Sequence, residues 1–255
     1  MAAFVLRILA ENAGLFHRGE PGWAPAALTA RQAATLRAAA NPSGRPNTDV
    51  LRGCLGFAAP RLRERWQIDF APHLTAQEAR LYVEPFARLA RRLEAARPGE
   101  WWVNPHAAPA LRSALARLDR FLVQPILASR PAWHWVDAVW LPDDSLLVAA
   151  RDDDFTGGVL QSRVFAAWWR DARPAAGPLR ALQSFPFPWP PDTALGALSR
   201  PQQDLRSEIG RAARAGNAPQ IDASVAAAYG WPADLENPEL VERLHALNAR
   251  RPAAG

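Results

Sequence analysis

The stretch RDDDFTGGVLQSR, residues 151–163, marks the place where a strand-rich pattern gives way to helices. Three segments before it are apolar or alternate in polarity, as strands do, and they cover 121–127, 133–141 and 145–151. Because Pro142-Asp143-Asp144 is a turn sequence, we expect the last two segments to form a β-hairpin. If these residues continued a strand, the side chains of Asp152 and Asp154 would share one face. We instead interpret the three aspartates as a turn that positions the next strand.

Helices are expected on the C-terminal side of this stretch. A short helix that carries Phe165, Trp168 and Trp169 follows Ser162. Further on, helical patterns cover 199–216, 221–229 and a segment that opens at Asn237. The run from Phe185 to Pro191 is so rich in proline that it fits neither a helix nor a central strand, and we interpret it as a linker.

The N-terminal side mixes turns, helices and one clear strand. Residues 65–70 alternate as a half-buried strand, and the members of one face are Trp66, Ile68 and Phe70. Thr75 and Glu78 have capping-box spacing ahead of an apolar stripe, and Pro85 is expected to bend that helix. Other helical patterns cover 29–39 and 107–118. The order of elements is typical of an α+β fold rather than of a βαβ repeat.

These patterns divide the chain into three expected regions. Residues 1–44 form a turn-rich N-terminal segment, and 45–192 form a mixed domain that ends in the proline-rich run. Residues 193–255 form a small domain that is entirely helical. The predicted fold class is therefore α+β, with a mixed domain followed by an all-α C-terminal domain.

Composition favours a polyanionic partner and a reducing compartment. The formal net charge is +5 and all 30 basic residues are arginine, which the heavy use of alanine and proline explains most simply as a compositional bias. A lone cysteine, Cys54, excludes an intramolecular disulfide. The apolar run at residues 4–10 is too short to cross a membrane and lacks a cleavage pattern. We expect a cytoplasmic protein without a membrane segment.

Several residues invite an enzymatic interpretation, and each has a simpler one. Asp152, Asp153 and Asp154 offer too few convergent oxygens for a hard cation, so we expect no metal site there. The five scattered histidines have no zinc spacing. Neighbours such as Asp69 with His73, or His134 with Asp137, arise by chance in a chain of this length. Most of the eleven tryptophans are expected in the core, and a minority are candidates for stacking on nucleotides.

Polar side chains near the predicted strand ends are the candidate DNA contacts. Arginine grips phosphate and the guanine edge, and the amides of glutamine and asparagine match adenine. The candidates are Arg120, Gln124, Arg130, His134, Arg151, Gln161 and Arg163, with Asn104 as a further adenine reader. For each residue alone a solvated or structural role competes with base contact, and Arg163 is alternatively a partner of Asp152 or Asp154.

Seven short blocks, in their order and spacing, resemble the C-terminal part of the MmeI-like (type IIL) adenine-specific DNA methyltransferases of restriction-modification systems. The blocks are Asn47–Arg52, Arg65–Phe70, Glu84–Phe86, Leu111–Leu115, Asp152–Arg163, Phe185–Pro191 and Ala227–Pro232. They cover about residues 41 to 250. One departure is Phe165, where similar proteins often carry a histidine.

The resemblance implies a target-recognition domain over 45–192 and a helical C-terminal domain after it. In that family a preceding Rossmann-like domain transfers a methyl group from S-adenosylmethionine to adenine. This sequence shows neither the glycine-rich turn for that cofactor nor an Asn-Pro-Pro-aromatic loop. We therefore expect a chain that is catalytically inactive alone and binds no cofactor. Double-stranded DNA and a separate methyltransferase subunit that carries S-adenosylmethionine are the expected partners.

Two other classes of function stay open at the level of sequence. One is a noncatalytic remnant that docks on a methyltransferase without reading DNA sequence. The other is a free-standing enzyme with a site of unfamiliar type, although no Gly-x-Ser-x-Gly elbow of a hydrolase is present.

Overall fold

The computed structural model describes residues 6–254, which form two compact units. Unit 1 consists of 6–18, 110–138 and 147–254, and unit 2 consists of 19–109 and 139–146. Helices and two small sheets occur together, so the predicted α+β class is confirmed. The units do not follow the expected divisions near residues 44 and 192, and the three-region organisation stays a prediction. The first residues of the apolar run at 4–10 lie outside the described part.

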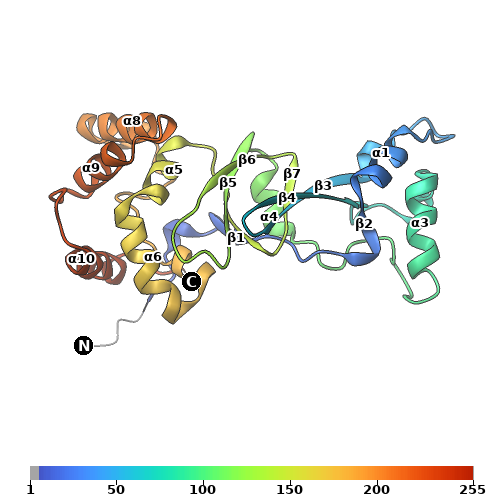
Figure 1. Cartoon of the computed structure of the whole chain (residues 1–255), viewed down its shortest axis with the longest axis horizontal. Helices are drawn as coiled ribbons and strands as arrows, with labels where there is room; N and C mark the ends of the chain where they lie inside the picture. The colour runs from blue at the N-terminus through green and yellow to red at the C-terminus, as the bar shows by residue number, and fades with distance from the viewer. Residues whose placement is uncertain (1–5, 255) are drawn as a thin grey trace. The chain divides into compact units, whose positions relative to one another are not determined.

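Unit 1 contains a four-stranded sheet in the order β1-β8-β5-β6, together with most of the helices (Figure 1). Its strands are β1 (Phe16–Arg18), β5 (Arg120–Pro125), β6 (His134–Asp137) and β8 (Leu146–Ala149). Its helical elements are η1 (Ala10–Asn12), α4 (Pro109–Leu115), α5 (Asp154–Gln161), α6 (Arg163–Ala176), α7 (Pro178–Gln183), η4 (Leu195–Ala197), α8 (Arg200–Arg214), α9 (Ala218–Tyr229) and α10 (Asn237–Arg250). The helices expected in the last sixty residues are present.

The proline-rich run belongs to the core of unit 1 and is not a linker. Phe185 and Phe187 are fully buried, and Trp189 is nearly so. Phe185 packs edge-on against the ring of Phe165, with the ring centroids 5.1 Å apart. The physical reason is that every second residue of this extended run is aromatic, so one face of it inserts rings while the prolines keep the backbone out of a helix.

The three aspartates start a helix rather than a strand, which corrects the expectation from sequence. Asp153 is the N-cap of α5, and its carboxylate accepts a hydrogen bond from the backbone N–H of Thr156 at 2.9 Å. Two glycines follow inside the helix, which is why the sequence did not favour one. A Cβ on Gly158 would lie 2.6 Å from the Cγ2 of Ile209, so glycine allows α5 and α8 to pack closely (Figure 1).

Unit 2 is built on a second four-stranded sheet, in the order β2-β4-β3-β7. Its strands are β2 (Ala27–Leu28), β3 (Leu51–Ala58), β4 (Arg61–Ile68) and β7 (Trp140–Pro142). Its helical elements are η2 (Ala24–Ala26), α1 (Ala30–Ala38), η3 (Asn47–Val50), α2 (Ala76–Ala79) and α3 (Val83–Leu93). No helix in the range 6–254 is long and apolar enough to cross a membrane.

The expected hairpin around residues 142–144 does not form. β7 pairs in parallel with Gly53–Leu55 of β3 in unit 2, whereas β8 pairs with β1 in the sheet of unit 1. The two strands that flank the turn sequence pair with other strands of the chain and not with each other. A local turn signal does not decide which strands share a ladder.

Most of the local expectations for unit 2 are confirmed. Ile68 and Phe70 are buried on one face, and Thr75 makes both hydrogen bonds of a capping box with Glu78. The single helix expected after Thr75 is instead two, because α2 ends at Ala79 and α3 begins at Val83. Pro85 lies in the first turn of α3, where its missing N–H costs nothing, and so marks a helix start rather than a bend. The core of unit 2 is rich in large aromatic residues: Trp23, Phe70, Tyr82, Phe86, Trp101 and Trp102.

Candidate nucleic-acid interface

The hairpin of β3 and β4 extends beyond the rest of its sheet. The two strands pair from Leu51 with Ile68 to Ala58 with Arg61. β2 reaches β4 only at Trp66 and Gln67, and β7 reaches β3 only at Gly53–Leu55. Among the strands of residues 6–254, none pairs with residues 56–65 from outside the hairpin, and we call this two-stranded segment the ribbon.

One face of the ribbon carries a row of three arginines. Arg61, Arg63 and Arg65 alternate along β4, so their side chains leave the same face about 6.8 Å apart. All three are exposed. Within the range 6–254, no hydrogen bond, ion pair or ring contact joins the side chain of any of them to another residue. We call these three residues the arginine row.

The neighbours of the arginine row on β3 are small and leave it uncovered. Ala58, Gly56 and Cys54 lie directly opposite Arg61, Arg63 and Arg65. A Cβ on Gly56 would lie 1.9 Å from a carboxylate oxygen of Asp143, so glycine is required here. That carboxylate accepts a hydrogen bond from the Ser145 N–H at 3.0 Å and is not within ion-pair distance of Arg63.

A second group of positive charges lies on α3 of unit 2. Arg88, Arg91 and Arg92 lie within two turns of this helix. Burial of the Arg88 guanidinium, together with the charges of Arg92 and Arg91, lowers its pKa from the ordinary value. Arg92 donates to the carbonyl oxygen of Pro25 at 2.9 Å, so it is held in place within the unit.

Among the residues expected to contact DNA, Arg120 is engaged inside unit 1. Its guanidinium donates to a carboxylate oxygen of Asp154 at 2.7 Å and to the carbonyl oxygen of Asp152 at 3.1 Å. It also lies over the ring of Trp135, 3.9 Å from the centroid. Arg120 thus ties the end of β5 to the turn before α5.

Arg151 and Arg163 also have internal partners. Arg151 donates to Asp153 at 3.0 Å and to the carbonyl oxygen of Pro191 at 2.8 Å. Arg163 donates to the carbonyl oxygens of Ala233, at 2.8 Å, and of Leu235. Arg163 therefore has an internal partner, as the alternative interpretation expected, but that partner is neither Asp152 nor Asp154. Its guanidinium reaches the loop between α9 and α10 instead.

The three aspartates are surrounded by arginines rather than by cation ligands. Asp154 pairs with Arg120 and Arg214, and Asp153 pairs with Arg151 and Arg206. Over residues 6–254 no three His, Cys, Asp or Glu residues are grouped so that they could hold a metal ion. Clustered acids at a helix start are neutralised here by guanidinium groups from several elements.

The expected adenine readers divide into buried and exposed residues. Gln124 is fully buried, and its side-chain oxygen accepts from the Ala132 N–H at 3.3 Å. Asn104 is also buried and accepts from the His106 N–H at 2.9 Å. Gln161 lies exposed at the end of α5.

Arg130 and His134 are exposed at the connection between β5 and β6. The same loop exposes Leu127, whose accessible fraction is 85%. The structure thus brings Arg120 and Arg151 together at the aspartate turn and leaves Arg130, His134 and Gln161 on the surface. A DNA-contact role for the seven candidates stays a prediction.

The arginine row was not predicted, although the sequence contains a signal for it. Arg61, Arg63 and Arg65 have the period of two that a strand gives to one face. The partner strand β3 contains Gly53 and Gly56, which disfavour a strand by propensity. Trp140 lies against Gly53 and Asp143 against Gly56, so both glycines are needed for contacts with residues far away in the sequence.

No family model and no curated protein sequence matches this chain. Among solved structures, the chain is similar to the type IIL restriction-modification enzyme MmeI in complex with DNA, with a TM-score of 0.57 and 14% sequence identity. The match covers 92% of this chain and 35% of the MmeI chain. This chain therefore spans about a third of the length of that enzyme, and the two share a fold over that part.

Proposed function

We propose that this chain is the DNA target-recognition part of a site-specific adenine-N6 methyltransferase of a restriction-modification system, and that the ribbon contacts double-stranded DNA. The observation that carries the proposal is the arginine row, which is exposed and has no partner in the described part of the chain. The major groove of B-DNA admits a two-stranded β-ribbon, and arginine binds both phosphate and guanine.

Electrostatics supports a polyanionic partner for this surface. Three like charges about 6.8 Å apart repel one another, and no carboxylate of residues 6–254 lies within ion-pair distance of the arginine row. A phosphate backbone along the ribbon supplies the missing negative charges, and the release of its counterions adds to affinity.

The remainder of the proposal is supported by similarity. Seven blocks of the sequence resemble the recognition part of the type IIL enzymes, and a solved structure with the same fold is a complex with DNA. We propose that methyl transfer and S-adenosylmethionine binding belong to a separate catalytic subunit, and that this chain supplies the choice of site.

The DNA-binding part of the proposal is tested by fluorescence anisotropy with labelled duplex DNA over a range of salt concentrations. We expect the logarithm of the binding constant to fall by roughly 0.9 for each phosphate contact per log unit of salt. Arg63→Ala should lower this slope by about one contact, whereas Arg170→Ala, an exposed residue of α6, is the matched control. Absence of binding at low salt would refute the proposal.

The choice of site is tested by selection from random duplexes. An enriched sequence supports target recognition, whereas binding without enrichment favours a docking protein that does not read DNA. Mixing the chain with a separately encoded Asn-Pro-Pro-Phe-type methyltransferase subunit should then produce adenine methylation at the enriched sequence. Methylation that is unchanged by this chain would contradict the proposed role.

A further inference from the structure

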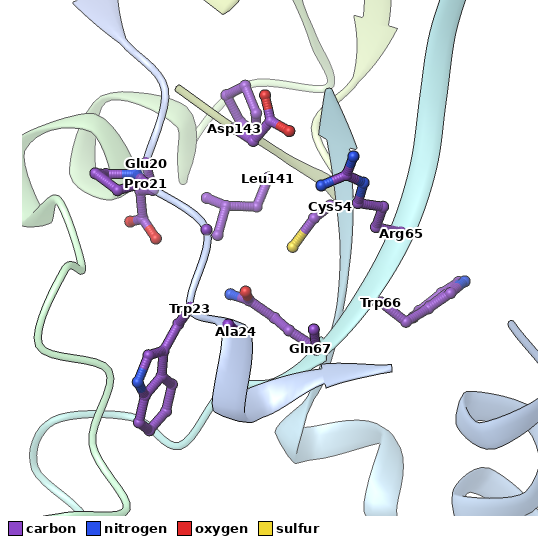
Figure 2. Close-up of a pocket in the computed structure, with 13 residues that line it drawn as sticks. Glu20, Pro21, Trp23, Ala24, Cys54, Arg65, Trp66, Gln67, Leu141 and Asp143 are labelled. Carbon is purple, nitrogen blue, oxygen red and sulfur yellow. The ribbon is translucent and has the colours of Figure 1, made fainter. Parts of the chain in front are cut away.

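The face that carries the arginine row continues along β4 to Gln67, beside a cavity of about 280 Å³. The cavity lies in unit 2, between β4 and the segment of residues 20–24 (Figure 2). Arg65 and Gln67 both line it, so the last member of the row is also part of the cavity wall.

The Gln67 carboxamide has no partner inside the described part of the chain. The residue is only 7% exposed, and no hydrogen bond to its side chain occurs there. Figure 2 shows the carboxamide directed into the cavity, toward the same space as the thiol of Cys54. The amide atoms face the accessible space of the cavity, so their donor and acceptor are available to a ligand that enters it.

The other walls of the cavity are largely apolar. Pro21, Ala24 and Leu141 line it, whereas the rings of Trp23 and Trp66 point away from its centre (Figure 2). The Glu20 carboxylate accepts from the Ala108 N–H at 2.8 Å. The Gln67 amide is thus directed into a largely apolar cavity whose other polar wall residues are Glu20, Cys54, Arg65 and Asp143.

We infer that this cavity holds a single unstacked nucleobase, read by the Gln67 carboxamide. A carboxamide places a donor and an acceptor side by side, which is the pattern that the edge of a nucleobase matches. The cavity is slightly smaller than sites for larger ligands, which span roughly 300–1,000 Å³, so it fits one ring system. The inference rests on the proposed function, because the arginine row would hold the backbone on either side of that base.

Cys54 provides a direct reporter, since it is the single cysteine of the chain and lines the cavity. The rate at which an aromatic disulfide reagent modifies its thiol is measured on the full chain. The probes are the four deoxynucleosides and short homopolymeric single strands, whose bases are already unpaired. A strand of abasic residues is the matched control, because it shows whether the sugar-phosphate backbone alone shields the thiol from the reagent.

We expect at least one base type to slow the modification of Cys54, and the abasic strand to have no such effect. Gln67→Leu should weaken the protection about tenfold, because two neutral hydrogen bonds are lost. The same variant should keep the thermal stability of the wild type, since the amide has no partner to lose. Ala24→Phe fills the cavity from an exposed position and serves as a second variant.

The outcomes separate the cavity from the DNA-binding surface. Protection by strands that Arg63→Ala weakens, without protection by nucleosides, identifies a base of DNA as the ligand. Protection by nucleosides together with no DNA binding supports the cavity and contradicts the proposed function. If DNA binds with the expected salt dependence but Cys54 reacts equally fast with every probe, the cavity inference is overturned. Protection that is unchanged in both variants overturns it as well.

Discussion

Two sets of arginines in this molecule have opposite surroundings. In unit 1, Arg120, Arg151 and Arg163 donate to carboxylates and backbone carbonyls near the start of α5 and in the loop before α10. In unit 2, the arginine row on the ribbon has no such partner in the described part of the chain. Arginine at a strand end is therefore no guide to DNA contact until its hydrogen bonds are known.

The difference follows from what surrounds each guanidinium. This group has five N–H donors and no acceptor, so a partly buried one needs several oxygen atoms nearby. In unit 1, the aspartate turn, Pro191 and the loop between α9 and α10 provide those oxygens. On the ribbon, the facing positions are alanine, glycine and cysteine, and the donors remain available to solvent or to a ligand.

The largest effect is expected from removal of the whole arginine row. Arg61, Arg63 and Arg65 changed together to Ala should reduce the salt slope of duplex binding by roughly 2.7, which is three contacts of 0.9 each. Thermal stability should stay the same, since no internal contact is lost. Arg170, Arg211 and Arg250 changed together to Ala alter the net charge equally and are the control. An equal decrease of the salt slope in both triple variants would indicate that DNA binding depends on net charge alone and not on the position of the arginines.

Arg163→Ala should have the opposite profile. It removes hydrogen bonds to the carbonyl oxygens of Ala233 and Leu235, which we expect to lower the free energy of unfolding by about 2 kcal/mol. The salt slope for DNA should be unchanged. Chemical denaturation and anisotropy on the same preparation check the two parts, and a stable variant that loses base preference would assign Arg163 to recognition instead.

Arg130→Ala tests whether the exposed loop of unit 1 contacts DNA independently of the ribbon. Because Arg130 has no partner within residues 6–254 and lies near the exposed Leu127, we expect unchanged stability and a slope lowered by about 0.9. The measurement is again anisotropy against salt. A slope equal to that of the wild type would restrict the DNA contact to the ribbon.

Gln124→Leu should have the smallest effect. The side chain is fully buried, and its amide nitrogen has no partner, so loss of the bond to the Ala132 N–H is offset by removal of an unsatisfied donor. Neither base preference nor stability should change by a measurable amount. A shift in the sequence selected from random duplexes would show that β5 opens on binding.

The sequence predicted local structure well and strand pairing poorly. The capping box of Thr75 with Glu78 and the helix predicted over 199–216, which is α8, depend on neighbours within a few residues. The pairing of Trp140–Pro142 with Gly53–Leu55 depends on residues almost ninety positions apart. Periodicity identifies the buried face of a strand, but it does not identify the partner.

The same limit explains what was missed at the candidate site. The period-two arginines on β4 were visible, but the two glycines of β3 concealed the strand opposite them. The aspartates of residues 152–154 were recognised as a local structural feature, whereas their four arginine partners come from β5, from Arg151 and from α8. Only the tertiary fold shows which arginines are engaged.

Arginine footprinting on the wild-type chain tests the central contrast most directly. Phenylglyoxal modification, read by mass spectrometry with and without duplex DNA, should label Arg61, Arg63 and Arg65 rapidly in the free chain and slowly in the complex. Arg120, Arg151 and Arg163 should react slowly in both states, because their donors already have partners. Protection of other arginines by DNA, while the arginine row stays fully reactive, would contradict the assignment of the ribbon as the DNA-binding surface.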